Sequence, residues 1–264
     1  MTQLQEPSAL GRIVTLVRDL RERCPWDASQ TPETLRSYLV EEVLELDHAI
    51  GTGEREALRT ELGDVLLHVA FQIVLAEERG DFGAEDLTRS VEEKMWRRHP
   101  HLFPDKVAAD DPPTERPASW ERTKRTEHGS TPPGVLDGLP PTLPALIMAY
   151  RLQERAAGVG FDWPDAAGPR EKVQEELSEL GDAQAREEPA ALIEETGDLL
   201  FAVVNLARKL GVDPRAALER ANAKFADRFA RLESLAAERG IDVGRSTLET
   251  LDRLWEDVKA ESGP

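Results

Sequence analysis

The stretch GDLLFAVVNLARKLG (197–211) carries large apolar residues at three- and four-residue spacing, at Leu199, Val203, Leu206 and Leu210. This spacing places them on one face of an α-helix. The same period recurs along almost the whole chain, and no segment shows the alternation of apolar and polar residues that is typical of a strand. The sequence therefore predicts an all-α fold.

Local signals for helix boundaries agree with this fold class. Asp213 stands directly before Pro214, a pair that favours a capped helix start because proline is tolerated in the first turn. Ser246 and Glu249 have the spacing of a capping box, which predicts another helix start. Glycines that follow helical patterns predict helix ends at Gly80, Gly211 and Gly240.

The composition excludes two classes of partner. Among 264 residues, 33 lysines and arginines stand against 51 aspartates and glutamates, a formal net charge of −18. A surface this acidic repels nucleic-acid polymers and anionic membranes. The longest apolar run, VLLHVAFQIVLA (65–76), is interrupted by two polar residues and is too short to span a bilayer. No secretion signal is recognisable and the only cysteine is Cys24, so we expect a cytoplasmic protein.

A repeat relates the two halves of the chain. EEVLEL (41–46) matches EELSEL (175–180), and ELGDVLL (61–67) matches ETGDLLF (195–201). Both pairs are separated by the same 134 positions, as 41 and 175 illustrate. Two motif pairs in the same order at the same separation indicate a duplication. We therefore expect two similar helical-bundle domains in tandem.

A proline-rich interval separates the two halves. Nine prolines lie between positions 104 and 144, and proline interrupts helices. Within this interval, SWERTKRTE (119–127) has the composition of a short helix. We accordingly expect a first helical domain, a proline-rich linker with a short helix, and a second helical domain at 1–104, 105–142 and 143–264.

Each half carries the same acidic pattern, E-E-x-x-E followed after fifteen residues by E-x-x-D. A spacing of three puts both side chains of a motif on one face of a helix. Two such helices packed antiparallel bring four carboxylates together, which predicts a site for Mg²⁺, with Mn²⁺ as a substitute, because hard divalent ions prefer oxygen ligands. The candidate ligands are Glu42, Glu45, Glu61 and Asp64 in the first half, and Glu176, Glu179, Glu195 and Asp198 in the second.

The alternative is a solvated acidic face, because glutamate is a strong helix former. Gly63 and Gly197 argue against it, since each lies between the E and D of its motif and a glycine inside a helix costs about 0.5–1 kcal/mol relative to alanine. We expect close helix packing beside a ligand site to explain them. A di-iron centre that uses one histidine from each half is excluded, because the second half contains no histidine.

Basic residues at helical spacing suggest a site for anions. Lys224 and Arg228 lie four residues apart, as do Trp255 and Lys259. In a protein this acidic, we expect these cations to contact phosphates, with the indole stacking on a base or lining the pocket. Pairing with surplus surface carboxylates stays the alternative for each cation.

Several motifs in order resemble those of the MazG-type nucleoside triphosphate pyrophosphohydrolases of the two-domain bacterial kind. The resemblance covers nearly the whole chain except the proline-rich linker. Besides the two acidic blocks, the motifs that carry it are CPWD (24–27), RRHPHLF (97–103), GFDW (160–163), GDLLFAVVNLARKLG (197–211) and NAKFADRF (222–229).

The resemblance implies an all-α nucleoside triphosphate pyrophosphatase fold, a homodimer and Mg²⁺-dependent hydrolysis of ribo- or deoxynucleoside triphosphates to monophosphate and pyrophosphate, a housekeeping activity on the nucleotide pool. It places metal ligands on the eight carboxylates named above, with none of them substituted. It places phosphate contacts on Lys224, Arg228 and Lys259.

The chemistry of the carboxylate cluster suggests the catalytic roles. Metal ions held there would lower the pKa of a bound water and align it for attack on phosphorus. Glu175 lies one turn from Glu179 outside the core motif, and we take it as the candidate base or water-positioning residue. The remaining candidate catalytic residues are the second-half ligands Glu176, Glu179, Glu195 and Asp198.

Differences between the halves favour the second as the main catalytic site. Asn205 stands where the first half has Phe71, and Asn222 stands where it has Glu92. Amides hydrogen-bond a base or sugar, whereas a carboxylate repels phosphates. We therefore expect the first half to be a degenerate site, or to serve dimerisation and metal binding.

Two other functions fit the same residues. A regulatory module would bind nucleotide and metal without turnover, and a pyrophosphohydrolase of another kind would act on a non-nucleotide phosphate ester. Complete carboxylate quartets favour catalysis, because binding alone needs fewer metal ligands. Release of pyrophosphate from a panel of nucleoside triphosphates separates the three hypotheses.

Overall fold

The computed structural model of the protein describes residues 8–99, 101–106 and 134–262. All regular secondary structure in these ranges is helical, which confirms the predicted all-α fold. The chain divides into two compact units, Met1–Glu115 and Arg116–Pro264. No helix in the described ranges combines the length and apolar character that a membrane crossing requires.

The expected linker, 105–142, falls largely outside the described residues. The short helix expected at 119–127 lies wholly outside them. The division between the two units falls inside the same interval. The boundaries that we assign at 104 and 142 stay predictions.

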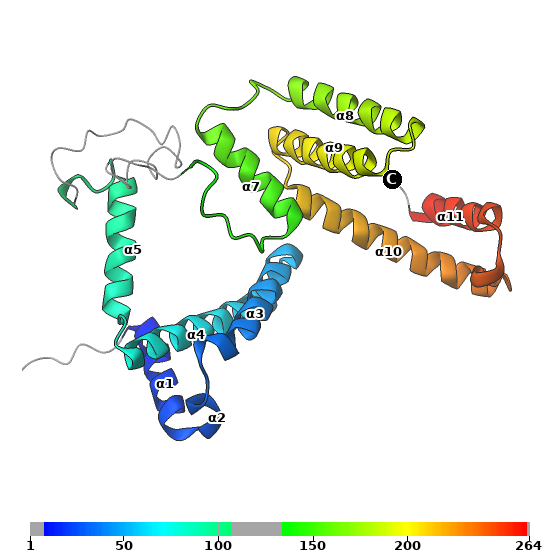
Figure 1. The fold of residues 1–264 in the computed structure, drawn as a ribbon. Helices are drawn as coiled ribbons and strands as arrows, with labels where there is room; N and C mark the ends of the chain where they lie inside the picture. The colour runs from blue at the N-terminus through cyan, green and yellow to red at the C-terminus, as the bar shows by residue number, and fades with distance from the viewer. Residues whose placement is uncertain (1–7, 100, 107–133, 263–264) are drawn as a thin grey trace, which may run out of the picture. The chain divides into compact units, whose positions relative to one another are not determined.

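The first unit is built on a helical hairpin. α3 (Pro32–Thr52) and α4 (Arg55–Arg79) follow one another through a short turn and pack together, and α1 (Ala9–Arg23) packs on α4 (Figure 1). The other elements are α2 (Pro25–Ala28), α5 (Ala84–Arg98) and the 3-10 helix η1 (Pro104–Lys106). Burial of apolar side chains between α1, α3 and α4 forms the core, which contains Val17, Leu35, Ala70, Phe71, Val74 and Leu75.

The second unit repeats this arrangement and adds a further hairpin. α8 (Ala167–Ala185) and α9 (Pro189–Lys209) pack together, and α7 (Ala145–Gly158) packs on α9 (Figure 1). The additional hairpin consists of α10 (Pro214–Glu238) and α11 (Leu248–Ser262), with the 3-10 helix η2 (Val243–Arg245) between them. It has its own apolar cluster, formed by Leu232, Ala236, Leu254 and Val258.

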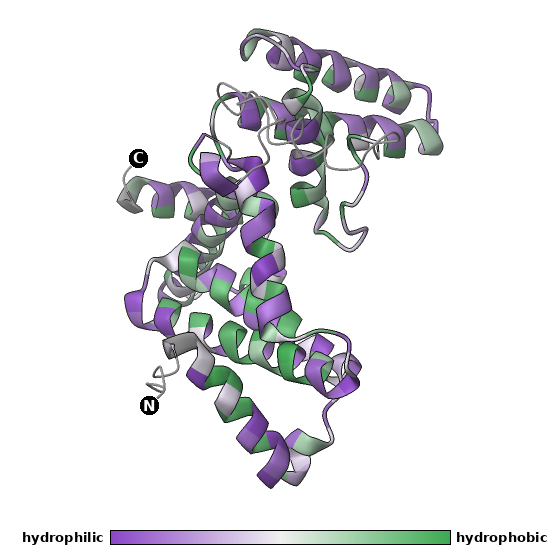
Figure 2. Cartoon of the chain, turned by 90° about the vertical axis from the view of Figure 1, so that its left-hand side faces the viewer, coloured by the Kyte–Doolittle hydropathy of each residue, from purple (hydrophilic) through white to green (hydrophobic). Residues whose placement is uncertain are grey.

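Apolar and polar residues alternate along the helices of both units (Figure 2). Such mixing allows a helix to bury one face and expose the other, although α5 has no buried residue. The repeated motifs lie on equivalent elements, because α3–α4 and α8–α9 are both two-helix hairpins whose second helix packs against an earlier helix, α1 or α7. The three-dimensional arrangement therefore agrees with a duplication.

Two of the predicted boundary signals are confirmed and one is wrong. The Asp213 carboxylate accepts hydrogen bonds from the backbone N–H groups of residues 215 and 216, and Gly80, Gly211 and Gly240 end helices with φ of 74°, 71° and 64°. These positive φ values favour glycine. Ser246 does not cap α11: its hydroxyl donates to the Asp242 carbonyl, and Thr247 accepts from the Thr250 N–H instead.

The expectation of a close helix contact at the two motif glycines is also wrong. A Cβ atom built on Gly63 or on Gly197 meets no other atom within 4 Å. Both positions face open space in this chain. Glycine is therefore not required there by the packing of α3 against α4, or of α8 against α9.

Candidate active site

Three carboxylates converge on the α8–α9 hairpin. Glu176 and Glu179 project from α8, Glu195 projects from α9, and one oxygen of each lies within 4.8 Å of the others. Glu176 is only 4% exposed. Burial raises the pKa of Glu179, and repulsion from the other two carboxylates raises it further. Mutual repulsion of this kind favours a bound cation, so the cluster fits a divalent ion with oxygen ligands.

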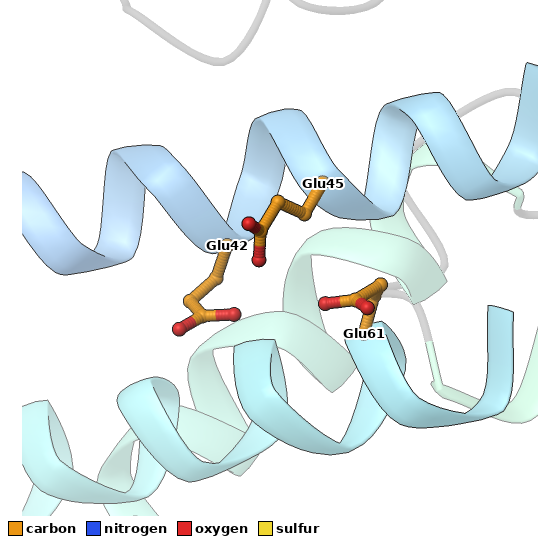
Figure 3. A group of neighbouring side chains, drawn as sticks. All are labelled: Glu42, Glu45 and Glu61. Atoms are coloured by element: carbon orange, nitrogen blue, oxygen red, sulfur yellow. The ribbon is translucent and has the colours of Figure 1, made fainter. Parts of the chain in front are cut away.

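The α3–α4 hairpin holds an equivalent cluster. Glu42 and Glu45 point from α3 toward Glu61 on α4 (Figure 3), and their nearest oxygens also lie within 4.8 Å of one another. Burial raises the pKa of Glu42, followed by repulsion from Asp64 and the other members. Asp64 and its equivalent Asp198 do not belong to these groups of three oxygens. The structure thus brings together three of the four predicted ligands in each half.

Lys172 joins the second cluster, a role that the acidic motif did not predict. Its Nζ lies 2.5 Å from an oxygen of Glu176 and 3.0 Å from one of Glu175. Hydrogen bonds to the two glutamates raise the pKa of Lys172, so it stays charged. The spacing of four between Lys172 and Glu176 on one helix was the available signal. At the equivalent position the first half has Tyr38.

The ammonium of Lys172 also bears on the candidate base. Glu175 is paired with it and is not a free carboxylate in this arrangement.

A cavity of about 490 Å³ opens beside the second cluster. It is large enough for a small molecule. Charged groups from the cluster line it together with apolar and aromatic side chains and two amides. The lining residues are Leu136, Leu152, Gln153, Ala156, Phe161, Asp162, Trp163, Lys172, Glu176, Asp198, Phe201, Ala202, Asn205 and Arg208.

The GFDW segment forms one wall of this cavity and is tied to α9. Asp162 accepts hydrogen bonds from Arg208 at 2.5 Å and from Lys209 at 3.2 Å. The bond from Arg208 is the main reason that the pKa of Asp162 is lowered. Trp163 lies so close to Gly168 that a Cβ there would come within 2.0 Å of the indole. The absence of a side chain at this glycine gives the indole its place.

Asn205 lies in the same cavity, as its predicted role requires. It is 8% exposed, and its Oδ1 accepts hydrogen bonds from Nε and Nη2 of Arg208 at 3.1 and 2.8 Å. These bonds hold Oδ1 toward Arg208, so that Nδ2 is the group that points away from Arg208. In the first half the equivalent Phe71 is part of the apolar core.

The predicted phosphate-binding cations lie on the α10–α11 hairpin and do not line the cavity within one chain. Lys224 and Asn222 are exposed and Arg228 is half-buried. Trp255 packs against Phe225, with ring centroids 5.3 Å apart. Lys259 pairs with its neighbour Glu256 at 2.5 Å.

The first half has a different surrounding for its cluster. An open groove of about 710 Å³ lies between α3 and α4 and includes Glu45, Glu61 and His48. His68 approaches Glu42 to 3.9 Å, and burial lowers the pKa of this histidine. Neither a lysine in the cluster nor a buried amide pair is present among the described residues of this groove.

Comparison with known proteins identifies the family. Residues 30–103 match the MazG nucleotide pyrophosphohydrolase domain, and residues 159–225 match the phosphoribosyl-ATP pyrophosphohydrolase domain. The chain is 44% identical to the nucleoside triphosphate pyrophosphohydrolase/pyrophosphatase MazG of Thermotoga maritima, over 94% of each protein.

Two further relatives extend this comparison. The chain is 40% identical to the nucleoside triphosphate pyrophosphohydrolase of Escherichia coli strain K12, over 96% of this chain and 97% of that protein. It is 41% identical to the uncharacterized protein YabN of Bacillus subtilis, over 93% of this chain and 50% of that protein. Because the identity extends over nearly the full length of the first two relatives, the chain belongs to the MazG family of nucleoside triphosphate pyrophosphohydrolases.

Proposed function

We propose that this protein hydrolyses nucleoside triphosphates to nucleoside monophosphate and pyrophosphate, with the second half as the main catalytic site. The observation that carries the proposal is the continuity of the cavity with the carboxylate cluster. Glu176, Asp198 and Lys172 line the same space as the aromatic wall. A polyphosphate and a nucleoside therefore fit into one site.

We further propose Mg²⁺ as the cofactor, held by Glu176, Glu179 and Glu195, with Asp198 on the same face of α9 as a fourth ligand. When bound, the ion would polarise the phosphate oxygens and lower the pKa of a water ligand. The three carboxylates provide hard oxygen donors and nothing softer, which favours Mg²⁺ or Mn²⁺ over Zn²⁺.

Lys172 has a second task in this proposal. Its ammonium neutralises Glu176 and Glu175 in the free chain. Once a cation takes over that charge compensation, the ammonium is free to contact a phosphate oxygen of the substrate. Glu175 is then released from its ion pair and becomes available to orient the attacking water.

We also propose that the active protein is a cytoplasmic homodimer. The α8–α9 hairpin exposes large apolar side chains, which are Leu177, Ile193, Leu200, Phe201 and Val203. Contiguous exposed apolar surface favours an interface. A second copy is also a source of Lys224, Arg228 and Lys259 for the cavity, which no cation from α10–α11 lines within one chain.

A pair of matched variants tests the site. Glu179→Gln and Glu45→Gln change equivalent residues of the two clusters. Pyrophosphate release from a panel of ribo- and deoxynucleoside triphosphates with Mg²⁺ is expected to fall by at least about a hundredfold in Glu179→Gln, because a metal ligand is lost. Glu45→Gln is expected to retain most of the activity. The reverse pattern would place catalysis in the first half, and no pyrophosphate from any triphosphate would contradict the proposed function.

The oligomeric state has a separate test. Light scattering of the purified protein is expected to give twice the chain mass of 29.4 kDa. A mass of one chain at micromolar concentration would exclude the proposed dimer.

A further inference from the structure

A buried amide in the cavity has an acceptor with no partner. Gln153 on α7 is 6% exposed, and its Nε2 donates to the Phe201 carbonyl of α9 at 2.8 Å. This bond fixes which end of the amide is nitrogen. The Oε1 atom is buried and accepts no hydrogen bond. Buried polar groups are nearly always paired, so an orphan acceptor in a cavity wall indicates a missing donor.

Asn205, one turn after Phe201 on α9, supplies a hydrogen-bond donor that complements this acceptor. Because Arg208 donates both of its hydrogen bonds to Oδ1, the Nδ2 group of Asn205 is the donor presented away from Arg208. Gln153 and Asn205 both line the cavity. The two amides beside the cavity thus provide one buried, unpaired acceptor and one donor, and other protein groups set their orientations.

Within the cavity, the amide pair lies at a distance from the carboxylates, where the phosphates would bind. Asp198 belongs to the acidic motif and Asn205 lies seven residues later on the same helix, a distance of about 10 Å along its axis. Phe161 and Trp163 line the cavity as well, and aromatic faces stack on nucleobases. A nucleotide with its phosphates at the carboxylates would place its base among the aromatic residues and the amides.

We propose that Gln153 recognises the nucleobase by accepting a hydrogen bond from an N–H group of the base, while Asn205 donates to the neighbouring acceptor of the same base. This inference rests on the proposed function and specifies how its substrate is held. On its Watson–Crick edge, each standard base presents an N–H beside an acceptor. The amide pair therefore admits all standard bases and discriminates against bases that lack the N–H donor. Because Oε1 is shielded in the free chain, this contact requires a small side-chain shift of the kind that commonly accompanies binding.

The first half lacks these groups. No amide lines the groove beside its cluster among the described residues, and at the position equivalent to Asn205 it has Phe71, which is buried in the apolar core. Base recognition of this kind is thus confined to the second half.

The test deletes the donor from the substrate and the acceptor from the protein. We compare ATP with purine riboside triphosphate, which lacks the 6-amino group, and CTP with pyrimidin-2-one riboside triphosphate, which lacks the 4-amino group. The wild-type protein is expected to prefer the amino form by roughly fivefold to a hundredfold in kcat/KM, mainly through KM, because the analogue leaves Oε1 unpaired. In Gln153→Met this preference is expected to vanish.

Gln184→Met is the matched control, because Gln184 is an exposed glutamine of the same unit. It is expected to keep the wild-type preference. Equal turnover of amino and deamino substrates by the wild-type protein would overturn the inference without any variant, so the test survives a failure of Gln153→Met to fold. A preference that changes in Gln153→Met only between ATP and dATP would assign the amide to the sugar and overturn recognition of the base.

The outcomes separate the two proposals. Equal turnover of amino and deamino substrates would overturn base recognition by Gln153 and would leave the proposed function standing. No pyrophosphate from any triphosphate would overturn the proposed function as well.

Discussion

Replacement of Lys172 by methionine provides a direct test of charge compensation in the second cluster. The ammonium lies 2.5 Å from Glu176 and 3.0 Å from Glu175, and Glu176 is almost fully buried. Methionine keeps the aliphatic stem and removes the charge. The buried Glu176 and its neighbouring carboxylates then repel one another without a counter-charge, so the apo protein is expected to lose stability.

The magnitude follows from the geometry. At 2.5 and 3.0 Å the attraction is stronger than that of an ion pair at about 4 Å, because the Coulomb energy varies inversely with the separation. The Lys172 side chain is 40% exposed, so water screens much of this attraction. After this screening, the remaining loss is expected to lower the Tm by about 2–8 °C for a unit of this size.

The assay is thermal unfolding in EDTA and in excess Mg²⁺. A cation at the carboxylates replaces the missing ammonium, so Mg²⁺ is expected to raise the Tm of Lys172→Met more than that of the wild-type protein. Tyr38→Met is the matched control, because Tyr38 occupies the equivalent position in the first half without an ion pair. An unchanged Tm in EDTA, or a loss that Mg²⁺ leaves untouched, would refute the reasoning.

Three further predictions concern the cavity wall and the cluster. In Gly168→Ala the new Cβ would come within 2.0 Å of Trp163, so the indole is expected to be displaced, with a red-shifted tryptophan emission and a higher KM. In the control Gly181→Ala the new Cβ meets no atom within 4 Å, so the emission and the KM are expected to stay unchanged. Asp162→Asn removes a carboxylate whose pKa is lowered in the fold, so chemical denaturation at pH 7 is expected to show a free energy of unfolding lower by about 1–2 kcal/mol. This difference is expected to disappear as the pH falls through the pKa of Asp162, because the wild-type protein then loses the same stabilisation. The pKa of Glu179 is shifted upward, opposite to that of Asp162, so its protonated form is favoured in the apo fold. Calorimetry is therefore expected to show weaker Mg²⁺ binding at pH 5 than at pH 7, and equal affinities would contradict this.

The fold class was accessible from local patterns because helical periodicity and caps depend on neighbours in the sequence. The leucine and valine spacing of 199–210 and the cap at Asp213 both appear in the structure as predicted. Ser246 failed as a cap because two adjacent hydroxyl residues compete for the role, and the path of η2 places Thr247 at the helix start. Boundaries of this kind depend on the direction of the preceding chain.

The candidate site was accessible in part for the same reason. Spacing of three along a helix defines which carboxylates share a face, so Glu176 and Glu179 were found from sequence. Gln153 was not found from the sequence, because it belongs to no local pattern. Its orientation depends on a hydrogen bond to Phe201, 48 positions away. The expected contact at Gly197 was wrong because a helical glycine does not reveal what lies opposite it.

The sequence by itself determined that the protein is helical, duplicated and equipped with two acidic clusters, because these properties follow from residue types and their spacing. Only the tertiary structure decided which groups surround each cluster. It places Lys172, the GFDW wall and two oriented amides around the second cluster, while the first has Tyr38 in place of the lysine and Phe71 in its core. The physical reason is that a cavity is formed by side chains from separate helices, and their burial and hydrogen bonds exist only once α7, α8 and α9 have packed.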